Sequence, residues 1–268
     1  MRISFTKAHG AGNDFLLTWT SEAPREGLDR AARAICGRHT GIGADGWMLV
    51  SAAAEERGCH AEIRLYNSDG SRAEISGNGT RCAAAFLVER NLALTPVRIR
   101  TEAGLKELRL IERSGLRFSF EMDMGRPVSR PEEARCLLDL GAGRREVTLL
   151  NAGNPQCAVF VDDFTLDWRS LGAEIESHPR FPSRTNVSFV RVEDEHTLDV
   201  RFWERGAGET MSSGTGSCGA VWAAMLRGLV RSPVRVLTPG GPMDARWDET
   251  LYLTGPAEIT GRGEYYFE

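Results

Sequence analysis

Two continuously apolar, alanine-rich stretches are the clearest elements of the chain, and they span residues 80–88 and 218–229. Each follows a segment of serine and glycine, which suits the start of a helix. A stretch that is apolar on every side is typical of a helix buried on nearly all sides. The pattern therefore predicts two central, buried helices.

Short runs rich in β-branched and aromatic residues precede both stretches, for example residues 63–66 and 198–203. Such runs are typical of strands. Each is followed by a polar loop, a Ser-Gly-X-Gly segment and the predicted helix. We therefore expect an α/β (α+β) protein in which a curved sheet wraps round a central buried helix, and in which this unit is made twice.

An internal repeat supports the duplication. Asn13, in the sequence AGND, matches Asn154, in AGNP, at an offset of 141 residues. Arg38 and Arg180 each precede a turn and an apolar run, at an offset of 142. The third match is longer: RLYN at 64–67 and RFWE at 201–204 are each followed, twelve residues after the arginine, by Ser-Gly-X-Gly, at an offset of 137.

Three matches in the same order at nearly constant offset predict two pseudo-symmetric halves. We place the first half at residues 1–117, with residues 257–268 returning to it, and the second half at residues 118–256.

The Ser-Gly-X-Gly segments also carry the first candidate chemistry. The first backbone N–H groups of a helix have no partner within the helix and carry the positive end of its dipole, so they attract anions. Glycines that only permit tight turns are the alternative explanation for a single segment. With two copies, both helix starts can hold one carboxylate, and Ser76 and Ser213 are expected on opposite faces of the ligand. This is the layout of a two-sided proton transfer.

Composition excludes several classes of protein. The 268 residues are 41% hydrophobic and 26% charged, with a formal net charge of -4 and basic residues spread along the chain, which argues against a nucleic-acid partner. No apolar run approaches the length of a membrane span, and the N-terminus lacks a signal-peptide layout, so we expect a cytoplasmic protein. The six cysteines show neither a CxxC motif nor dense spacing, and we expect free thiols and no metal.

Several blocks of the sequence closely resemble the diaminopimelate epimerase family. They are HGAGNDF (9–15), RHTGIGADG (38–46), YNSDGSRAEISGNGTRC (66–82), GNPQ (153–156), RTNVSFV (184–190) and ERGAGETMSSGTGSC (204–218). The resemblance implies two mirrored α/β halves facing each other across a cleft. It also implies an enzyme that interconverts LL- and meso-diaminopimelate for lysine and peptidoglycan precursor synthesis, works without a cofactor and forms a homodimer in the cytoplasm.

The resemblance also assigns residue roles. Family positions that bind the substrate's polar groups match Asn13, Asn67, Asn154, Asn186, Glu204 and Arg205, and backbone donors to the reacting carboxylate match Gly77, Asn78, Gly214 and Thr215. Arginine can bind a carboxylate in bidentate fashion, which suits a substrate with two amino-acid ends. A structural ion pair between Glu204 and Arg205 is the alternative explanation for those two residues.

The chain departs from the family pattern at the catalytic positions. The family has two cysteines, the base and the acid of the reaction, where this chain has Ser76 and Ser213, and it usually has histidine at the supporting position of Gln156. A thiolate is accessible at neutral pH, whereas a serine hydroxyl is a far weaker acid and needs a general base. Glutamine cannot be that base.

Several explanations stay open: an epimerase working through hydroxyls or through a displaced thiol such as Cys82 or Cys218, an engineered Cys-to-Ser form, or a diverged homologue that binds an amino acid or runs another reaction. A nucleotide-binding protein is the alternative from another class, because residues 41–46 and 214–219 both fit GxGxxG. Neither match has the full strand, helix and acidic-residue context of that motif.

Overall fold

The computed structural model describes residues 1–53 and 58–268 and divides into two compact units. Unit 1 comprises Met1–Met122 and Gly255–Glu268, and unit 2 comprises Asp123–Thr254. The sequence-based boundaries, at 117/118 and 256/257, lie a few residues away in the same connecting strands. Because β17 (Thr250–Tyr266) contains the second boundary, one strand belongs to both units.

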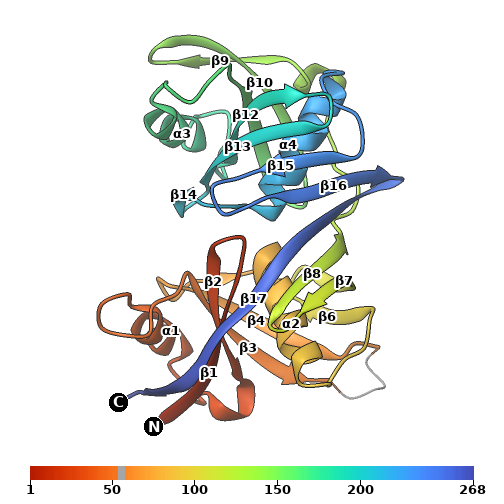
Figure 1. Cartoon of the computed structure of the whole chain (residues 1–268). Coiled ribbons are helices and arrows are strands. Elements are labelled where there is room, and N and C mark those ends of the chain that lie inside the picture. The colour runs from red at the N-terminus through yellow and green to blue at the C-terminus, as the bar shows by residue number, and fades with distance from the viewer. Residues whose placement is uncertain (54–57) are drawn as a thin grey trace. The chain divides into compact units, whose positions relative to one another are not determined.

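Unit 1 follows a strand-rich order (Figure 1). Its elements are β1 (Arg2–Gly10), β2 (Asn13–Trp19), η1 (Thr20–Glu22), α1 (Leu28–Cys36), β3 (Gly46–Ala52), β4 (Ala61–Asn67), β5 (Arg72–Ala73), α2 (Gly77–Glu89), β6 (Val97–Thr101), β7 (Gly104–Ser114), β8 (Arg117–Asp123) and most of β17.

Unit 2 repeats this order. Its elements are η3 (Pro131–Glu133), β9 (Cys136–Leu140), β10 (Gly143–Asn151), β11 (Pro155–Phe160), α3 (Trp168–Glu176), β12 (Asn186–Asp194), β13 (Thr197–Glu204), β14 (Gly208–Thr210), α4 (Gly214–Leu226), β15 (Val234–Leu237), β16 (Met243–Asp248) and the start of β17.

Strand pairing is duplicated step by step. In unit 1, β1 and β2 form an antiparallel hairpin, β2 runs parallel to β3, β3 antiparallel to β4, and β4 parallel to β6. In unit 2, the pairs β10–β11, β11–β12, β13–β12 and β13–β15 have the same directions in the same order. In unit 1, β17 also pairs with β1 and β8, which closes the curved sheet into a barrel. The fold is therefore α+β and internally repeated, as the sequence predicts.

The predicted central helices are α2 and α4. Every residue of α2 from Gly77 to Val88 is buried, and Cys82 and the three following alanines have no exposed surface. Most of α4 is buried in the same way, in a core with strand residues such as Val200 and Phe202. Small side chains explain this placement, because they allow a helix to lie close to strands on all sides.

The helix boundaries differ from the sequence-based ones. Both helices start earlier than predicted, at Gly77 and Gly214, because the serine before each glycine caps the helix. Helix α4 also ends earlier than residue 229. Gly228 has φ +70°, and the N–H groups of Gly228 and Leu229 donate to the carbonyls of Met225 and Ala224. This is the Schellman arrangement that ends a helix.

A second helix packs on the outside of each sheet. Helix α1 contributes Ala31, Ala32 and Ile35 to a buried cluster with Leu16 and Trp47 of unit 1. Helix α3 does the same in unit 2.

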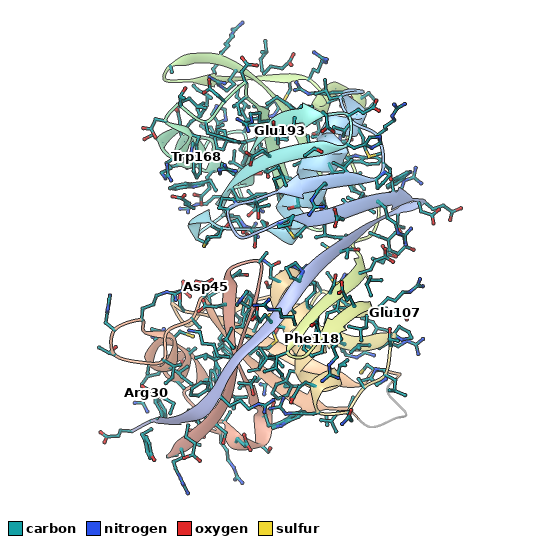
Figure 2. All side chains as sticks on the ribbon, in the orientation of Figure 1. Arg30, Asp45, Glu107, Phe118, Trp168 and Glu193 are labelled. Carbon is teal, nitrogen blue, oxygen red and sulfur yellow. The ribbon has the colours of Figure 1, made fainter. Side chains whose placement is uncertain are left out.

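Trp168 of α3 packs on Phe189 of β12, with ring centroids 5.8 Å apart. Figure 2 shows Trp168 on α3 and Phe118 on β8, both buried, while Arg30 and Glu107 carry their charges on the surface. Within residues 1–53 and 58–268, no helix is long and apolar enough to cross a membrane.

Candidate functional site

Ser76 caps the N-terminus of α2. Its backbone is extended, with φ -130° and ψ 121°, and its Oγ accepts the N–H of Gly79 at 3.1 Å. The carbonyl of Ser76 accepts both the N–H and the hydroxyl of Thr80, at 2.8 and 2.7 Å. The serine hydroxyl therefore lies at the positive end of the helix dipole.

Ser213 repeats this arrangement in α4. Its φ and ψ are -137° and 124°, and its Oγ accepts the N–H of Gly216 at 3.1 Å. Its carbonyl accepts the N–H of Ser217 at 2.9 Å. Ser213 is buried, with 4% of its surface exposed, whereas Ser76 is half-buried. The predicted equivalence of the two serines is thus seen in their local geometry.

The last glycine of each Ser-Gly-X-Gly segment lies against its sheet. A Cβ on Gly79 would come within 2.8 Å of Met48 Cε, and one on Gly216 within 2.8 Å of the Phe202 ring. Both contacts are shorter than real Cβ atoms show, so a larger residue at either position would require the neighbouring side chain to move, which the flexible end of Met48 can do more easily than the Phe202 ring. The glycines therefore allow each helix N-terminus to pack closely against its sheet, and this packing fixes its position.

Asn13 and Asn78 lie together in unit 1. Asn13 is at the start of β2, and its Oδ1 accepts the side-chain N–H of Asn78 at 3.3 Å. The Asn78 amide oxygen in turn accepts a hydrogen bond from Arg81, which is fully buried. The structure therefore brings two of the predicted site residues together at the start of α2, next to Gly77 and Ser76.

The matching residues of unit 2 also meet. Asn154 Nδ2 donates to Thr215 Oγ1 at 3.3 Å, and Gln156 Nε2 donates to Asn154 Oδ1 at 2.6 Å and to Thr215 Oγ1 at 3.3 Å. Gln156 is 3% exposed, and its Oε1 is buried without a hydrogen-bond partner among the described residues. A buried acceptor of this kind is usually satisfied by water or a ligand.

Asn186 and Arg205 are linked through the backbone. Asn186 Oδ1 accepts the N–H of Arg205 at 3.0 Å, and Asn186 Nδ2 donates to the Pro155 carbonyl at 2.9 Å. The Arg205 side chain is exposed, and its guanidinium donates to the Ser183 carbonyl at 3.2 Å. A guanidinium with several N–H groups can bind a carboxylate in addition to such a contact.

Asn67 and Glu204 end equivalent strands, β4 and β13. Asn67 donates to the Ser71 hydroxyl at 2.9 Å within the following turn. The Glu204 carboxylate accepts the hydroxyl of Thr210 at 2.7 Å. Each side chain is half-buried, and each is oriented by a hydrogen bond to a residue that follows it closely in the chain.

Glu176, at the end of α3, is a residue that sequence reasoning missed. Its carboxylate accepts the Gly206 N–H at 2.9 Å, the Trp203 indole N–H at 2.8 Å and Arg184 at 3.1 Å. Burial alone would raise the pKa of Glu176, but these three hydrogen bonds outweigh it and hold the pKa below its usual value. Glu176 thereby fixes the turn that carries Glu204 and Arg205; no motif in the sequence marks it.

The cysteines near the serines lie in the core. Cys82 and Cys218 have no exposed surface, and burial raises the pKa of Cys82 to about 12. Cys36 is also buried, and its pKa is raised to about 12 by burial and by the carboxylates of Asp14 and Asp45. A thiol with such a pKa holds its proton at neutral pH, so Cys82 is unsuited to act as the displaced base.

The two GxGxxG matches have structural roles. A Cβ on Gly41 would lie 2.2 Å from the Ala34 carbonyl, so this glycine lets the loop close over the end of α1. Gly43, with φ +79°, lies in the same loop. Residues 214–219 form the first turns of α4 itself. Neither segment is a strand-to-helix loop of the nucleotide-binding type.

Solved structures share this fold over nearly the whole chain. A hydroxyproline epimerase from Agrobacterium vitis, solved with trans-4-hydroxy-L-proline, matches 98% of this chain and 92% of its own with a TM-score of 0.73 at 17% identity. A PhzF-family phenazine biosynthesis protein from Bacillus anthracis matches all of both chains with a TM-score of 0.72 at 15% identity. The fold is therefore the one shared by these epimerase and PhzF-family proteins.

Sequence comparison gives the particular family. The family model of diaminopimelate epimerase matches residues 5–129 and 148–260. The diaminopimelate epimerase of Halothermothrix orenii is 36% identical over 98% of this chain and 98% of its own. That of Pelotomaculum thermopropionicum is 38% identical over 98% and 99%. The chain belongs to the diaminopimelate epimerase family, whose members are isomerases.

Proposed function

We propose that the chain is a cofactor-independent amino-acid epimerase that interconverts LL- and meso-diaminopimelate by two-base proton transfer. The observation that carries the proposal is the matched pair of capped helix starts. Ser76 and Ser213 have the same backbone conformation and the same 3.1 Å contact to the third residue after them. In each unit, an asparagine that the resemblance assigns to substrate binding contacts the residue two positions after the serine: Asn13 contacts Asn78, and Asn154 contacts Thr215.

The proposed mechanism starts with the reacting carboxylate. Backbone N–H groups at Gly77, Asn78, Gly214 and Thr215 are the proposed donors to it. When the α-hydrogen leaves as a proton, negative charge spreads onto this carboxylate, so donors fixed at a helix N-terminus stabilise the transition state more than the ground state. Removal on one face and return on the other inverts the α-carbon.

In this scheme Ser76 and Ser213 are the groups on the two faces, and the distal amino-acid end of the substrate is held by polar groups such as Asn67, Asn186, Glu204 and Arg205. Gln156 supports the Ser213 side by fixing Asn154 and Thr215. The proposal requires that both helix starts serve one substrate molecule.

Exchange of the substrate's α-hydrogen tests the proposal. LL-diaminopimelate is incubated with the protein in deuterated water, and the α-hydrogen signal is followed by NMR. Loss of this signal together with formation of the meso isomer supports epimerisation. If the protein binds diaminopimelate but the α-hydrogen signal is retained, the protein is a binding protein and not an epimerase.

The serines favour that second function, a homologue that binds diaminopimelate without epimerising it. In the part of the chain that the structure describes, the two Oγ atoms accept hydrogen bonds from the backbone N–H groups of Gly79 and Gly216. A backbone N–H can stabilise a deprotonated serine oxygen, but it cannot act as the base that removes the proton from the serine hydroxyl. An engineered Cys-to-Ser form would behave in the same way, and the codons at 76 and 213 in the natural gene would identify it.

We also propose a cytoplasmic homodimer, from the resemblance to the family. Light scattering of the purified protein measures the mass of the species in solution, and a mass of one chain would contradict the dimer.

A further inference from the structure

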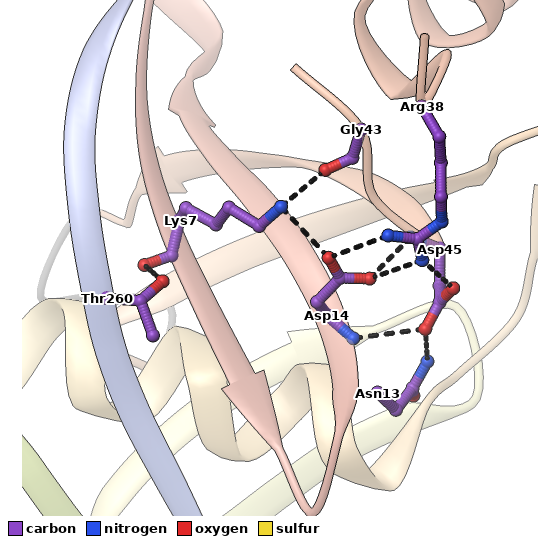
Figure 3. Close-up of polar contacts among 7 residues, drawn as sticks. All are labelled: Lys7, Asn13, Asp14, Arg38, Gly43, Asp45 and Thr260. Carbon is purple, nitrogen blue, oxygen red and sulfur yellow. Dashed lines mark hydrogen bonds and ion pairs between the residues drawn. The ribbon is translucent and has the colours of Figure 1, made fainter. Parts of the chain in front are cut away.

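The amide of Asn13 is held by a carboxylate. Asn13 Nδ2 donates to Asp45 Oδ2 at 2.7 Å, and the same oxygen accepts the backbone N–H of Asp14 at 3.1 Å (Figure 3). The other oxygen of Asp45 accepts Arg38 Nη2 at 2.7 Å. Asp45 is thus fixed on both of its oxygens, and one of them orients Asn13.

Arg38, which contacts Asp45, also belongs to an ionic cluster around Asp14. Arg38 Nη2 also contacts Asp14 Oδ1 at 3.0 Å, while Lys7 Nζ lies 3.0 Å from Asp14 Oδ2 and 2.6 Å from the Gly43 carbonyl. Burial would raise the pKa of Asp14, but hydrogen bonds and charges from Arg38 and Lys7 hold that pKa below its usual value. Asp14 therefore keeps its negative charge at neutral pH.

The opposite end of the chain of contacts is a cation. Asn13 Oδ1 accepts from Asn78, Asn78 Oδ1 accepts from Arg81, and Arg81 Nε donates to the Pro256 carbonyl at 3.1 Å. An ionised carboxylate can only accept and a guanidinium can only donate. Because a carboxylate begins this chain and a guanidinium ends it, the direction of every hydrogen bond between them is set, and both asparagine amides have one orientation.

We propose that Asp45 is a positioning residue that fixes Asn13 as a hydrogen-bond donor toward a carboxylate of the ligand. The Asn13 amide nitrogen has two hydrogens: one goes to Asp45, and the second is the donor for the ligand, while the amide oxygen is turned to Asn78. This inference rests on the proposed function for the identity of the ligand. It adds that the charge of Asp45, and not only the size of its side chain, determines that Asn13 presents an N–H donor to the ligand.

Unit 2 provides an internal comparison. The equivalent Asn154 amide contacts Thr215 and Gln156, both neutral. A neutral glutamine amide or hydroxyl can reverse its role as donor or acceptor, so it does not impose one direction. A charged side chain therefore sets the orientation of the asparagine amide at Asn13, whereas the amide of Asn154 contacts neutral groups.

Exchanging the two side chains tests the proposal. Asn13→Asp and Asp45→Asn, made together, keep the composition, the charge and one hydrogen bond, but reverse which residue donates. Titration calorimetry with meso-diaminopimelate and thermal melting are measured for both single variants and the double variant. We expect the double variant to regain melting temperature relative to Asn13→Asp, yet to bind at least tenfold more weakly than the parent, since a charge-assisted contact is replaced by an unfavourable one. Binding by the double variant within about threefold of the parent would overturn the proposal.

Asp29→Asn is the matched control, because Asp29 is also in unit 1 and also pairs with an arginine, Arg33 at 2.5 Å, but does not contact Asn13. We expect parent-like binding from this control. Equal weakening by Asp29→Asn and Asp45→Asn would show a general effect of charge and would contradict the positioning role.

NMR of the unliganded protein separates this inference from the proposed function. With ¹⁵N-labelled asparagine, the Asn13 side-chain signal is identified by its loss in Asn13→Asp. We expect one amide hydrogen to lie downfield in the parent, because it is bonded to a carboxylate, and to move upfield in Asp45→Asn. Unchanged Asn13 signals in that variant would overturn the inference. A parent protein that shows the shift but binds no diaminopimelate would instead contradict the proposed function alone.

Discussion

Ser76 and Ser213, 137 positions apart, cap their helices with the same geometry: each Oγ accepts the N–H of the third following residue at 3.1 Å. The hydroxyls therefore lie where a thiolate would be stabilised by the helix N-terminus. This relationship leads directly to the first prediction.

Replacing both serines, Ser76→Cys and Ser213→Cys, should raise the rate of LL-to-meso epimerisation by several powers of ten, because general acid–base terms are each worth about 10²–10⁴. Either single replacement should raise it much less, since inversion needs a competent group on each face of the α-carbon. The rate is measured by separating the two isomers after timed incubation.

The cap contact supplies the control for this experiment. Sulfur is a weaker acceptor than the hydroxyl, so each cysteine should also cost up to about 1 kcal/mol of unfolding free energy. Ser76→Thr keeps the cap and should leave both stability and rate near those of the parent. A folded double-cysteine protein that binds diaminopimelate but is no faster would mean that the site has diverged at other atoms.

Ligand preference is the second prediction. Lysine lacks the distal carboxylate of diaminopimelate, so it loses one charge-assisted contact worth about 1.5–3 kcal/mol and should bind more than tenfold more weakly. Calorimetry with both ligands on the unaltered protein measures the difference. Equal affinities would remove the case for diaminopimelate as the substrate.

Glu176 gives the third prediction, which concerns stability and pH. The pKa of Glu176 is lower in the folded chain than in the unfolded chain, so its contribution is present above the unfolded value of about 4.3 and is lost as the pH falls through the folded pKa. Glu176→Gln should therefore cost about 1.5 kcal/mol near pH 7, and the difference from the parent should shrink in acid. Denaturant unfolding at several pH values measures it.

Glu209→Gln is the matched control, because Glu209 also pairs with an arginine, Arg169, but on the surface. Exposed pairs contribute little to stability. If the two variants lose the same stability at pH 7, the three hydrogen bonds to Glu176 are not the source of its effect.

The buried thiols give the fourth prediction. Cys82 is fully buried and its pKa is raised to about 12, so the folded protein should protect it from iodoacetamide at pH 8, whereas a cysteine placed at 76 should react readily. Mass spectrometry of digested protein reports the extent of modification at each cysteine. Rapid modification of Cys82 in the native protein would reopen its role as a displaced base.

The duplicated fold could be predicted from the sequence because its signals are local and occur twice. A serine before glycines, an alanine-rich apolar run and a preceding strand are each visible within about twenty residues, and their repetition gave the two halves. The family blocks, which lie within the residues that the family model matches, suggested the candidate residues. The helix starts were placed late because Ser-Gly-X-Gly has the composition of a loop, and only the cap of Ser76 on Gly79 shows that the helix begins at Gly77.

The tertiary structure decided which side chains fix the candidate residues. Asp45 lies 32 positions from Asn13, and Glu176 lies 30 positions from Gly206, and neither spacing has a periodic signal in the sequence. Hydrogen bonds depend on distances of about 3 Å and on the direction of each donor, which follow from strand pairing and helix packing and not from composition. The sequence by itself therefore determined the family, the repeat and the candidate residues, whereas the polarity of the Asn13 amide and the anchoring of the Arg205 turn came only from the folded chain.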